Sequence, residues 1–329
     1  MTYKKEQNSI SELRLDLVSN DWVIVATGRA RRPDTFAKLK RTKEESSPKN
    51  CPFCQPEILT KAVLRHGNVI SIPNDFPVLS YSENLNRRSD GPSEIMDGVG
   101  FHEVIIALDH YKYLSQMTKE EVKEIIDVYQ MRYQGLIRER FVKYVSIFHN
   151  HGKEAGASIV HPHSQLIAIP VIDPDLRNSI EGAEFYYQRN KKCVYCTMIN
   201  WDIKDGRRII YENEKFVVLC PFAPQSDFEI RIYPKEHQPC FEEINEEEKK
   251  MFADALQTAL SKIYRGLNDP AYNFYIHTSP AEKSGQPFYH WHLVILPKPP
   301  TPPAGFEFCA GMEINTIEPE KAAEFLREI

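Results

Sequence analysis

The chain presents one order of features twice, and this weak internal duplication constrains its fold more than any single motif. Each copy has a Cys-x-x-Cys pair, an apolar run that leads to a lone histidine, a helical stretch, a second apolar run and a His-x-His motif. The lone histidine precedes the start of the helical stretch by the same spacing in both copies, from His110 to Thr118 and from His237 to Asn245. Chance does not readily produce five features in matching order, so we expect two homologous units.

Both helical stretches open with a capping-box pattern, Thr118 with Glu121 and Asn245 with Glu248. Apolar residues at helical spacing follow each pattern, which predicts one long amphipathic helix per unit. Short runs rich in β-forming residues flank the helices. They are Val104–Leu108, Tyr144–Phe148, Leu166–Ile169, Phe216–Leu219 and His292–Leu296. The pattern predicts an α+β fold in which each unit combines strands with one helix.

The boundary between the units is expected after the first His-x-His motif and before the second Cys-x-x-Cys pair. We place the first unit at residues 1–185 and the second at residues 186–329. Residues 181–192 are expected to connect them as a helix or a loop. Residues 320–327 have the pattern of a last exposed helix.

Composition narrows the functional class. The net charge of −5 and the pI near 6.2 disfavour nucleic acid and anionic membranes as partners. No apolar run has the length that a membrane span needs, and the first residues are polar, unlike a signal peptide. Seven cysteines, an odd number spread over 329 residues, argue against a disulfide scaffold. We therefore expect a cytoplasmic enzyme.

Two sets of soft ligands suit tetrahedral metal sites. The first set is Cys51, Cys54, His110 and His161; the second is Cys193, Cys196, His237 and His290. Four protein ligands leave no open position, so both sites are predicted to hold structural zinc, with iron as an alternative metal at the second. The competing interpretation is that these are buried free cysteines beside histidines with other partners.

The segment from His161 to Gln165 is predicted to carry the chemistry. Alternation along a strand places His161, His163 and Gln165 on one face. The preceding loop, residues 149–158, contains Gly152 and Gly156, whose backbone freedom would let N–H groups converge on an anion.

An imidazole attacks phosphorus well when its other nitrogen is held by a hydrogen bond, so His163 is the predicted nucleophile. Gln165 and Ser158 are predicted to donate to the non-bridging phosphate oxygens. A solvated strand face or a third metal site are the alternatives. The second His-x-His, His290-Trp-His292, lacks the following Ser and Gln, which indicates a structural copy.

At these residues the sequence resembles the galactose-1-phosphate uridylyltransferase family of the histidine-triad superfamily. The resemblance implies two tandem histidine-triad-like half-barrel units, a homodimer, and a nucleotidyl-histidine intermediate on His163. It makes His161, Cys51, Cys54 and His110 zinc ligands. It also implies nucleotide and phosphate contacts from Arg29, Arg32, Phe53, Asn74, Asp75, Asn150, Gly156, Ser158 and Gln165.

The carboxy-terminal region departs from the bacterial members of that family, which hold the hexose phosphate with a lysine and a glutamine. In residues 305–315, Glu307 stands near the place of the lysine and no glutamine is evident. The second Cys-x-x-Cys and the segment Ile276–Pro280 are more similar to the branch that includes plant adenylyl-sugar phosphorylases. These features leave open which nucleobase and which sugar the substrate carries.

The main functional prediction is a UDP-glucose–hexose-1-phosphate uridylyltransferase that works by ping-pong transfer through a uridylyl-histidine. Its substrates would be a nucleoside diphosphate sugar and a sugar 1-phosphate. The alternative is an ADP-glucose phosphorylase with inorganic phosphate as acceptor. A non-catalytic nucleotide-binding zinc protein is a further alternative.

Overall fold

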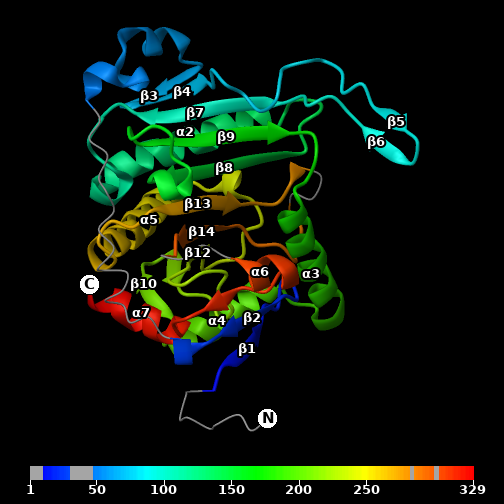
Figure 1. Cartoon of the computed structure of the whole chain (residues 1–329), viewed down its shortest axis with the longest axis vertical. Coiled ribbons are helices and arrows are strands. Elements are labelled where there is room, and N and C mark those ends of the chain that lie inside the picture. Colours follow the sequence, from blue (N-terminus) through cyan, green and yellow to red (C-terminus); the bar gives the residue numbers. More distant parts are fainter. Residues whose placement is uncertain (1–9, 30–46, 282–284, 300–303) are drawn as a thin grey trace.

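The computed structural model describes residues 10–29, 47–281, 285–299 and 304–329. Its centre is one ten-stranded sheet in which every neighbouring pair is antiparallel (Figure 1). In sheet order the strands are β10 (Ile209–Glu212), β11 (Phe216–Leu219), β12 (Ile230–Pro234), β14 (His292–Pro297), β13 (Tyr272–His277), β8 (Tyr144–His151), β9 (His163–Ile169), β7 (Phe101–Ala107), β4 (Val69–Pro73) and β3 (Leu64–His66). The predicted α+β class is confirmed.

The two halves of the chain meet in the middle of this sheet. β13 of the second half pairs with β8 of the first, with Asn273 opposite Asn150. The five runs of β-forming residues expected from the sequence lie in strands of this sheet, apart from Leu108, which follows the end of β7. The expected boundary at residues 185 and 186 falls inside helix α3 (Pro174–Asn190), and the division into two units stays a prediction.

The two long helices cover the same face of the sheet. They are α2 (Lys119–Leu136) and α5 (Glu246–Gly266), and both begin with the capping boxes that the sequence predicts, at Thr118 and Asn245. Their apolar side chains share one large core with residues from both halves of the sheet, because alternate residues of each strand point toward them.

The opposite face is covered differently in the two halves. In β11, Phe216 and Val218 face α2 and α5, whereas Val217 and Leu219 pack with helices α3 and α4 (Val194–Asp205). In the first half, a segment that contains Cys51 and Phe53 packs over β4 and β7 on this face. The residues of β8 that point this way, from Ser146 to Asn150, are only half-buried. The open part of this face lies beside His163.

The remaining elements lie around this sheet. A small sheet combines β1 (Glu12–Leu15), β2 (Trp22–Val25) and β15 (Ile314–Asn315), and β5 (Arg88–Asp90) with β6 (Ser93–Ile95) forms a hairpin. Short helix α6 (Gly305–Ala310) and helix α7 (Pro319–Glu328) end the chain. α7 corresponds to the expected last helix, but it is not exposed throughout, because Ala322, Ala323 and Leu326 are buried in the large core. None of the helices in the described part of the chain combines the length and the apolar character that a membrane span requires.

Candidate active site and metal centres

His163 is the first residue of β9 and lies opposite Ile106 of β7. Its Nδ1 lies 2.8 Å from the carbonyl oxygen of His161, which can only accept, so Nδ1 carries the proton. Burial lowers the pKa of His163 below its usual value. The imidazole is therefore neutral near pH 7, and Nε2 presents a lone pair, which is the state that a nucleophile needs.

Two neighbours complete the surroundings of His163. The ring of Phe53 meets the imidazole edge-on, with the ring centroids 5.2 Å apart. Gln165 lies two residues along the strand on the same face, and its Oε1 is 2.8 Å from Nε2 of His102 in β7. The same nitrogen is 3.1 Å from Nδ2 of Asn74, so His102 connects the segment after β4 to Gln165.

The loop between β8 and β9 contains two glycines with positive φ angles, as its sequence suggests. Gly152 and Gly156 have φ angles of +84° and +89°, which other residues adopt only with strain. A Cβ atom on Gly156 would lie 3.7 Å from Nδ2 of Asn150, an ordinary van der Waals contact. The N–H groups of Ala155, Gly156 and Ala157 donate to the carbonyl oxygens of Gly152 and Lys153, so they hold the loop together, and the Asn150 amide is the donor left for a phosphate.

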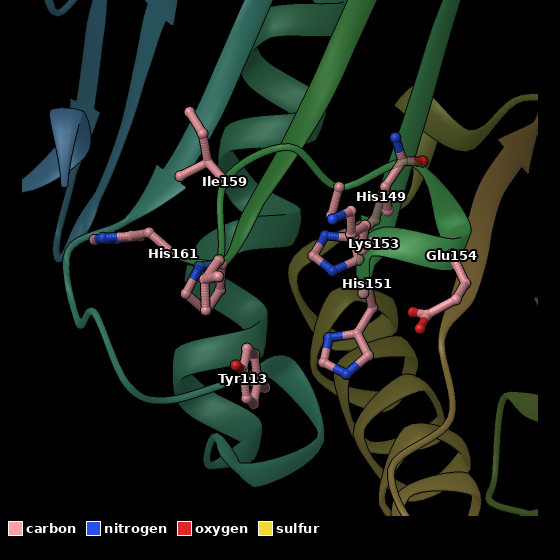
Figure 2. A pocket seen from close by; sticks show the side chains of 12 residues that line it. Tyr113, His149, His151, Lys153, Glu154, Ile159 and His161 are labelled. Atoms are coloured by element: carbon pink, nitrogen blue, oxygen red, sulfur yellow. The ribbon is translucent and has the colours of Figure 1, made fainter. Parts of the chain in front are cut away.

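A pocket of about 290 Å³ lies under this loop (Figure 2). His149 and His151 line it from β8, pointing toward the side covered by the long helices. Nδ1 of His149 is 2.9 Å from Oγ of Ser164, and Nε2 of His151 is 2.7 Å from Oδ1 of Asp269. His163 does not line this pocket. The hydrogen bonds of His149 and His151 instead hold the end of β8, where the loop begins.

The first predicted metal set comes together in space. Nδ1 of His110 is 3.2 Å from Nδ1 of His161 and 3.2 Å from Sγ of Cys54. Sγ of Cys51 is 3.6 Å from Nδ1 of His161. The other nitrogen of His161, Nε2, is 2.6 Å from the carbonyl oxygen of Ala107, which fixes the tautomer that leaves Nδ1 free to bind a metal.

The second predicted set also comes together. Sγ of Cys196 is 3.3 Å from Nδ1 of His237 and 3.5 Å from Nδ1 of His290. Nε2 of His290 is 2.9 Å from the carbonyl oxygen of Pro234. Cys193 caps helix α4, so this set joins the helix to the sheet.

Both sets fit a tetrahedral ion. Four ligands around zinc, with Zn–N near 2.0 Å and Zn–S near 2.3 Å, would lie roughly 3.3 to 3.8 Å from one another. The contacts described above run from 3.2 to 3.6 Å. All ligand atoms of each set lie within 4.8 Å of one another. Either cluster could hold a metal ion, and in the described residues no other group of His, Cys, Asp and Glu does so.

The other predicted site residues divide into three groups. Phe53, Gln165 and Asn74 are linked to the surroundings of His163, and Asn150 and Gly156 shape the loop. Asp75 and Ser158 are exposed; the carboxylate of Asp75 forms an ion pair with Nζ of Lys61 at 2.8 Å. Arg32 and the side chain of Arg29 lie outside the part that the structure describes. The roles of all these residues stay predictions.

Sequence reasoning missed two residues that contact the predicted ones, His102 and Asn273. Asn273 Nδ2 lies 2.7 Å from Oδ1 of Asn150 and 2.8 Å from the carbonyl oxygen of Ala155. The signal was present for both residues, because each is a polar side chain on an apolar strand. Nothing in the sequence indicated which residues they would face.

Comparison with known proteins agrees with this geometry. The family described as "Galactose-1-phosphate uridyl transferase, N-terminal domain" matches residues 1–172, and a domain of unknown function, DUF4921, matches residues 98–328. An ADP-glucose phosphorylase of Arabidopsis thaliana is 34% identical, covering 98% of this chain and 94% of that protein. A galactose-1-phosphate uridylyltransferase of Thermotoga maritima is 29% identical, covering 96% of this chain and 98% of that protein.

Solved structures show the same relationship. The crystal structure of an ADP-glucose phosphorylase from Arabidopsis thaliana with bound ADP-glucose has a TM-score of 0.82 at 33% identity, covering 98% of this chain and 99% of that one. A structure of a uridylyltransferase has a TM-score of 0.76 at 23% identity, covering 97% and 98%, and shares the fold. The findings favour the phosphorylase alternative over the main functional prediction.

These relatives are named as a phosphorylase and a uridylyltransferase. The predicted enzyme class, a nucleotidyltransferase, is therefore confirmed. The residue pattern that suggested the family, His-Pro-His-Ser-Gln at 161–165, begins the strand that carries the candidate nucleophile. The chain belongs to the galactose-1-phosphate uridylyltransferase family.

Proposed function

We propose that this protein is a nucleoside diphosphate sugar phosphorylase that acts on ADP-glucose, with inorganic phosphate as acceptor. The observation that carries the proposal is the state of His163, with Nδ1 committed to the His161 carbonyl and Nε2 neutral and unprotonated. The choice of ADP-glucose and phosphate is supported by the Arabidopsis relative, which is named for that activity and covers almost the whole chain.

The reaction would proceed in two displacements. Nε2 of His163 attacks the α-phosphorus of ADP-glucose, a P–N bond forms, and the bond to the bridging oxygen breaks to release glucose 1-phosphate. An oxygen of inorganic phosphate then attacks the same phosphorus and displaces His163, which yields ADP. Each displacement exchanges one bond to phosphorus for another, and the imidazole returns to its starting state.

The neighbouring donors would stabilise the charge that develops on the non-bridging oxygens. Gln165, the Asn150 amide and Ser158 are proposed for this role, with Gly156 beside the Asn150 amide. Phe53 is proposed to pack near the base, and Asn74 and Asp75 to hold base and ribose. Arg29 and Arg32 are proposed to contact the diphosphate.

Structural zinc is proposed in both clusters, with iron as an alternative in the second. Thiolate and imidazole ligands suit zinc, and the ligand separations fit it. A metal at Cys51, Cys54, His110 and His161 would hold the His161 carbonyl that orients His163, and it would take no part in either displacement.

A homodimer and a cytoplasmic location are proposed as well. Three exposed apolar side chains in the segment after β4 support a subunit interface at that segment: Phe76, Val78 and Tyr81. The seven cysteines, all free thiols, suit a reducing compartment.

The test is intact-mass spectrometry after brief incubation with ADP-glucose or UDP-glucose, on the wild type and the His163→Ala variant. We expect an adenylyl increment with ADP-glucose in the wild type alone, and its discharge by inorganic phosphate with formation of ADP. An adduct in the His163→Ala variant would overturn the role of that residue.

The uridylyltransferase reading keeps one supporting observation, the 29% identity to the Thermotoga relative over almost the full length. The same experiment separates the two. A uridylyl adduct from UDP-glucose, discharged by galactose 1-phosphate and untouched by phosphate, would replace our proposal. Nucleotide binding without any adduct would favour the non-catalytic protein.

A further inference from the structure

Asn273 belongs to β13, in the second half of the chain, but it faces the phosphate loop of the first half. It lies directly opposite Asn150 in the pairing of β13 with β8, and both side chains are half-buried on the same face of the sheet. The carbonyl oxygen of Ala155, between the two loop glycines, is the second group within its reach.

The hydrogen bonds of Asn273 determine which way two amides point. A backbone carbonyl can only accept, so the atom of Asn273 that lies 2.8 Å from the Ala155 oxygen is its NH2 group, Nδ2. The same NH2 group lies 2.7 Å from the Asn150 side chain, which must therefore present its oxygen, Oδ1. The assignment follows from the backbone and does not depend on a choice between amide orientations.

Asn150 then has only one orientation available. With Oδ1 turned to Asn273, its NH2 group points away, toward Gly156, where a Cβ atom would lie 3.7 Å from Nδ2. Nδ2 has no hydrogen-bond partner within the described part of the chain, and it is available to an acceptor. A flipped Asn150 would instead aim its carbonyl oxygen into a site built for phosphate oxygens.

We propose that Asn273 is a positioning residue, which locks the Asn150 amide with its donors toward the phosphate and holds the loop through the Ala155 carbonyl. The second unit, which lacks a nucleophile of its own, thereby supplies the group that orients the phosphate site of the first. The proposal rests on the proposed function for the identity of the ligand.

The experiment is a double-mutant cycle with Asn273→Leu, Asn150→Ala and the double variant. Leucine has a shape close to that of asparagine and no N–H donor. Asn200→Leu, at an exposed position of α4, is the matched control. The readout is the rate constant for formation of the His163 adduct at saturating ADP-glucose, with the adduct amplitude and the melting temperature recorded beside it.

We expect Asn273→Leu to lower the rate constant about 10- to 100-fold, the range for loss of an orienting partner or a transition-state donor. Amplitude and melting temperature should stay near those of the control. Asn150→Ala should lower the rate similarly, and the double variant should be no slower than the slower single variant. A merely structural role would reduce the amplitude and leave the rate constant of the remaining protein unchanged.

Two results would overturn the proposal: a rate constant for Asn273→Leu within twofold of the wild type, or single losses that multiply in the double variant. If the wild type binds ADP but forms no adduct, the proposed function fails and the same cycle in ADP affinity, measured by calorimetry, decides the role of Asn273. If the double variant then loses no more ADP affinity than the weaker-binding single variant, the role of Asn273 is supported. If the losses of the single variants multiply in the double variant, the role is overturned. A wild type that binds no ADP overturns both proposals.

Discussion

His163 owes its predicted reactivity to one hydrogen bond and to its burial. Its Nδ1–H donates to the carbonyl oxygen of His161, and burial keeps the imidazole neutral by lowering its pKa. His161 lies before β9, with Nδ1 in the first metal cluster and Nε2 on the Ala107 carbonyl, and the Phe53 ring packs against both imidazoles. The segment from His161 to His163 therefore gives one histidine to the candidate metal site and leaves the lone pair on Nε2 of the other.

Gln165 can be replaced by glutamate, which has nearly the same shape but a carboxylate in place of the amide. Gln165→Glu replaces the NH2 donor by an acceptor and adds negative charge beside phosphate oxygens. We expect the turnover rate with ADP-glucose and phosphate to fall on the order of 100-fold, as for loss of one transition-state donor.

The control for this prediction is Gln188→Glu, at an exposed position of α3. It makes the same chemical change away from His163 and should leave turnover unchanged. Equal turnover of Gln165→Glu and the wild type would remove Gln165 from the phosphate site.

At the scale of elements, the two metal clusters use the same construction. In each, the first histidine of the His-x-His motif donates through Nε2 to a carbonyl at the last residue of a strand, Ala107 of β7 or Pro234 of β12. His163 and His292 also share the contact of Nδ1 with the carbonyl two residues before. Both imidazoles are buried, and an aromatic ring packs against each, Phe53 against His163 and Tyr195 of α4 against His292.

The second cluster is predicted to stabilise the fold without entering the reaction, because it joins α4 to the sheet. Cys193→Ser should reduce the metal content, measured by plasma mass spectrometry, from two ions per chain to one. We expect the melting temperature to fall on the order of 5 °C, since metal binding contributes to the stability of the folded state. The adduct on His163 should still form.

Cys309→Ser is the matched control, because Cys309 is exposed and belongs to neither cluster. It should retain both ions and the wild-type melting temperature. One ion per chain in both the wild type and Cys193→Ser would show that the second cluster holds no ion, and two ions in both would show that Cys193 is not needed to hold it.

At the scale of the whole molecule, the continuous sheet joins the two halves. β8 and β13 are hydrogen-bonded neighbours, and one apolar core under α2 and α5 contains residues of both halves. Either half alone would expose a strand edge and part of this core to water.

We therefore predict one cooperative unfolding transition. Scanning calorimetry should give a single peak whose calorimetric and van't Hoff enthalpies agree, and far- and near-ultraviolet circular dichroism should report the same midpoint. Two resolved transitions would show that residues 1–185 and 186–329 unfold as separate units.

Much of this protein could be predicted from the sequence, because the signals concerned are local. Capping boxes, apolar periodicity and strand-forming runs depend on neighbours within a few residues, and they located α2, α5 and the main strands. The metal sets also followed from the sequence, since the duplicated order assigned each histidine to its own pair of cysteines, and the structure brings both sets together.

Only the tertiary structure decided which distant residues meet. The pairing of β13 with β8 opposes Asn273 to Asn150, and the pairing of β7 with β9 brings His102 to Gln165. Strand order and register depend on the packing of the whole core. The residues that face each other across two strands therefore carry no local signal of their pairing. The sequence by itself predicted the two units, the metal ligands and the nucleophile; the single sheet decided which side chains lie beside them.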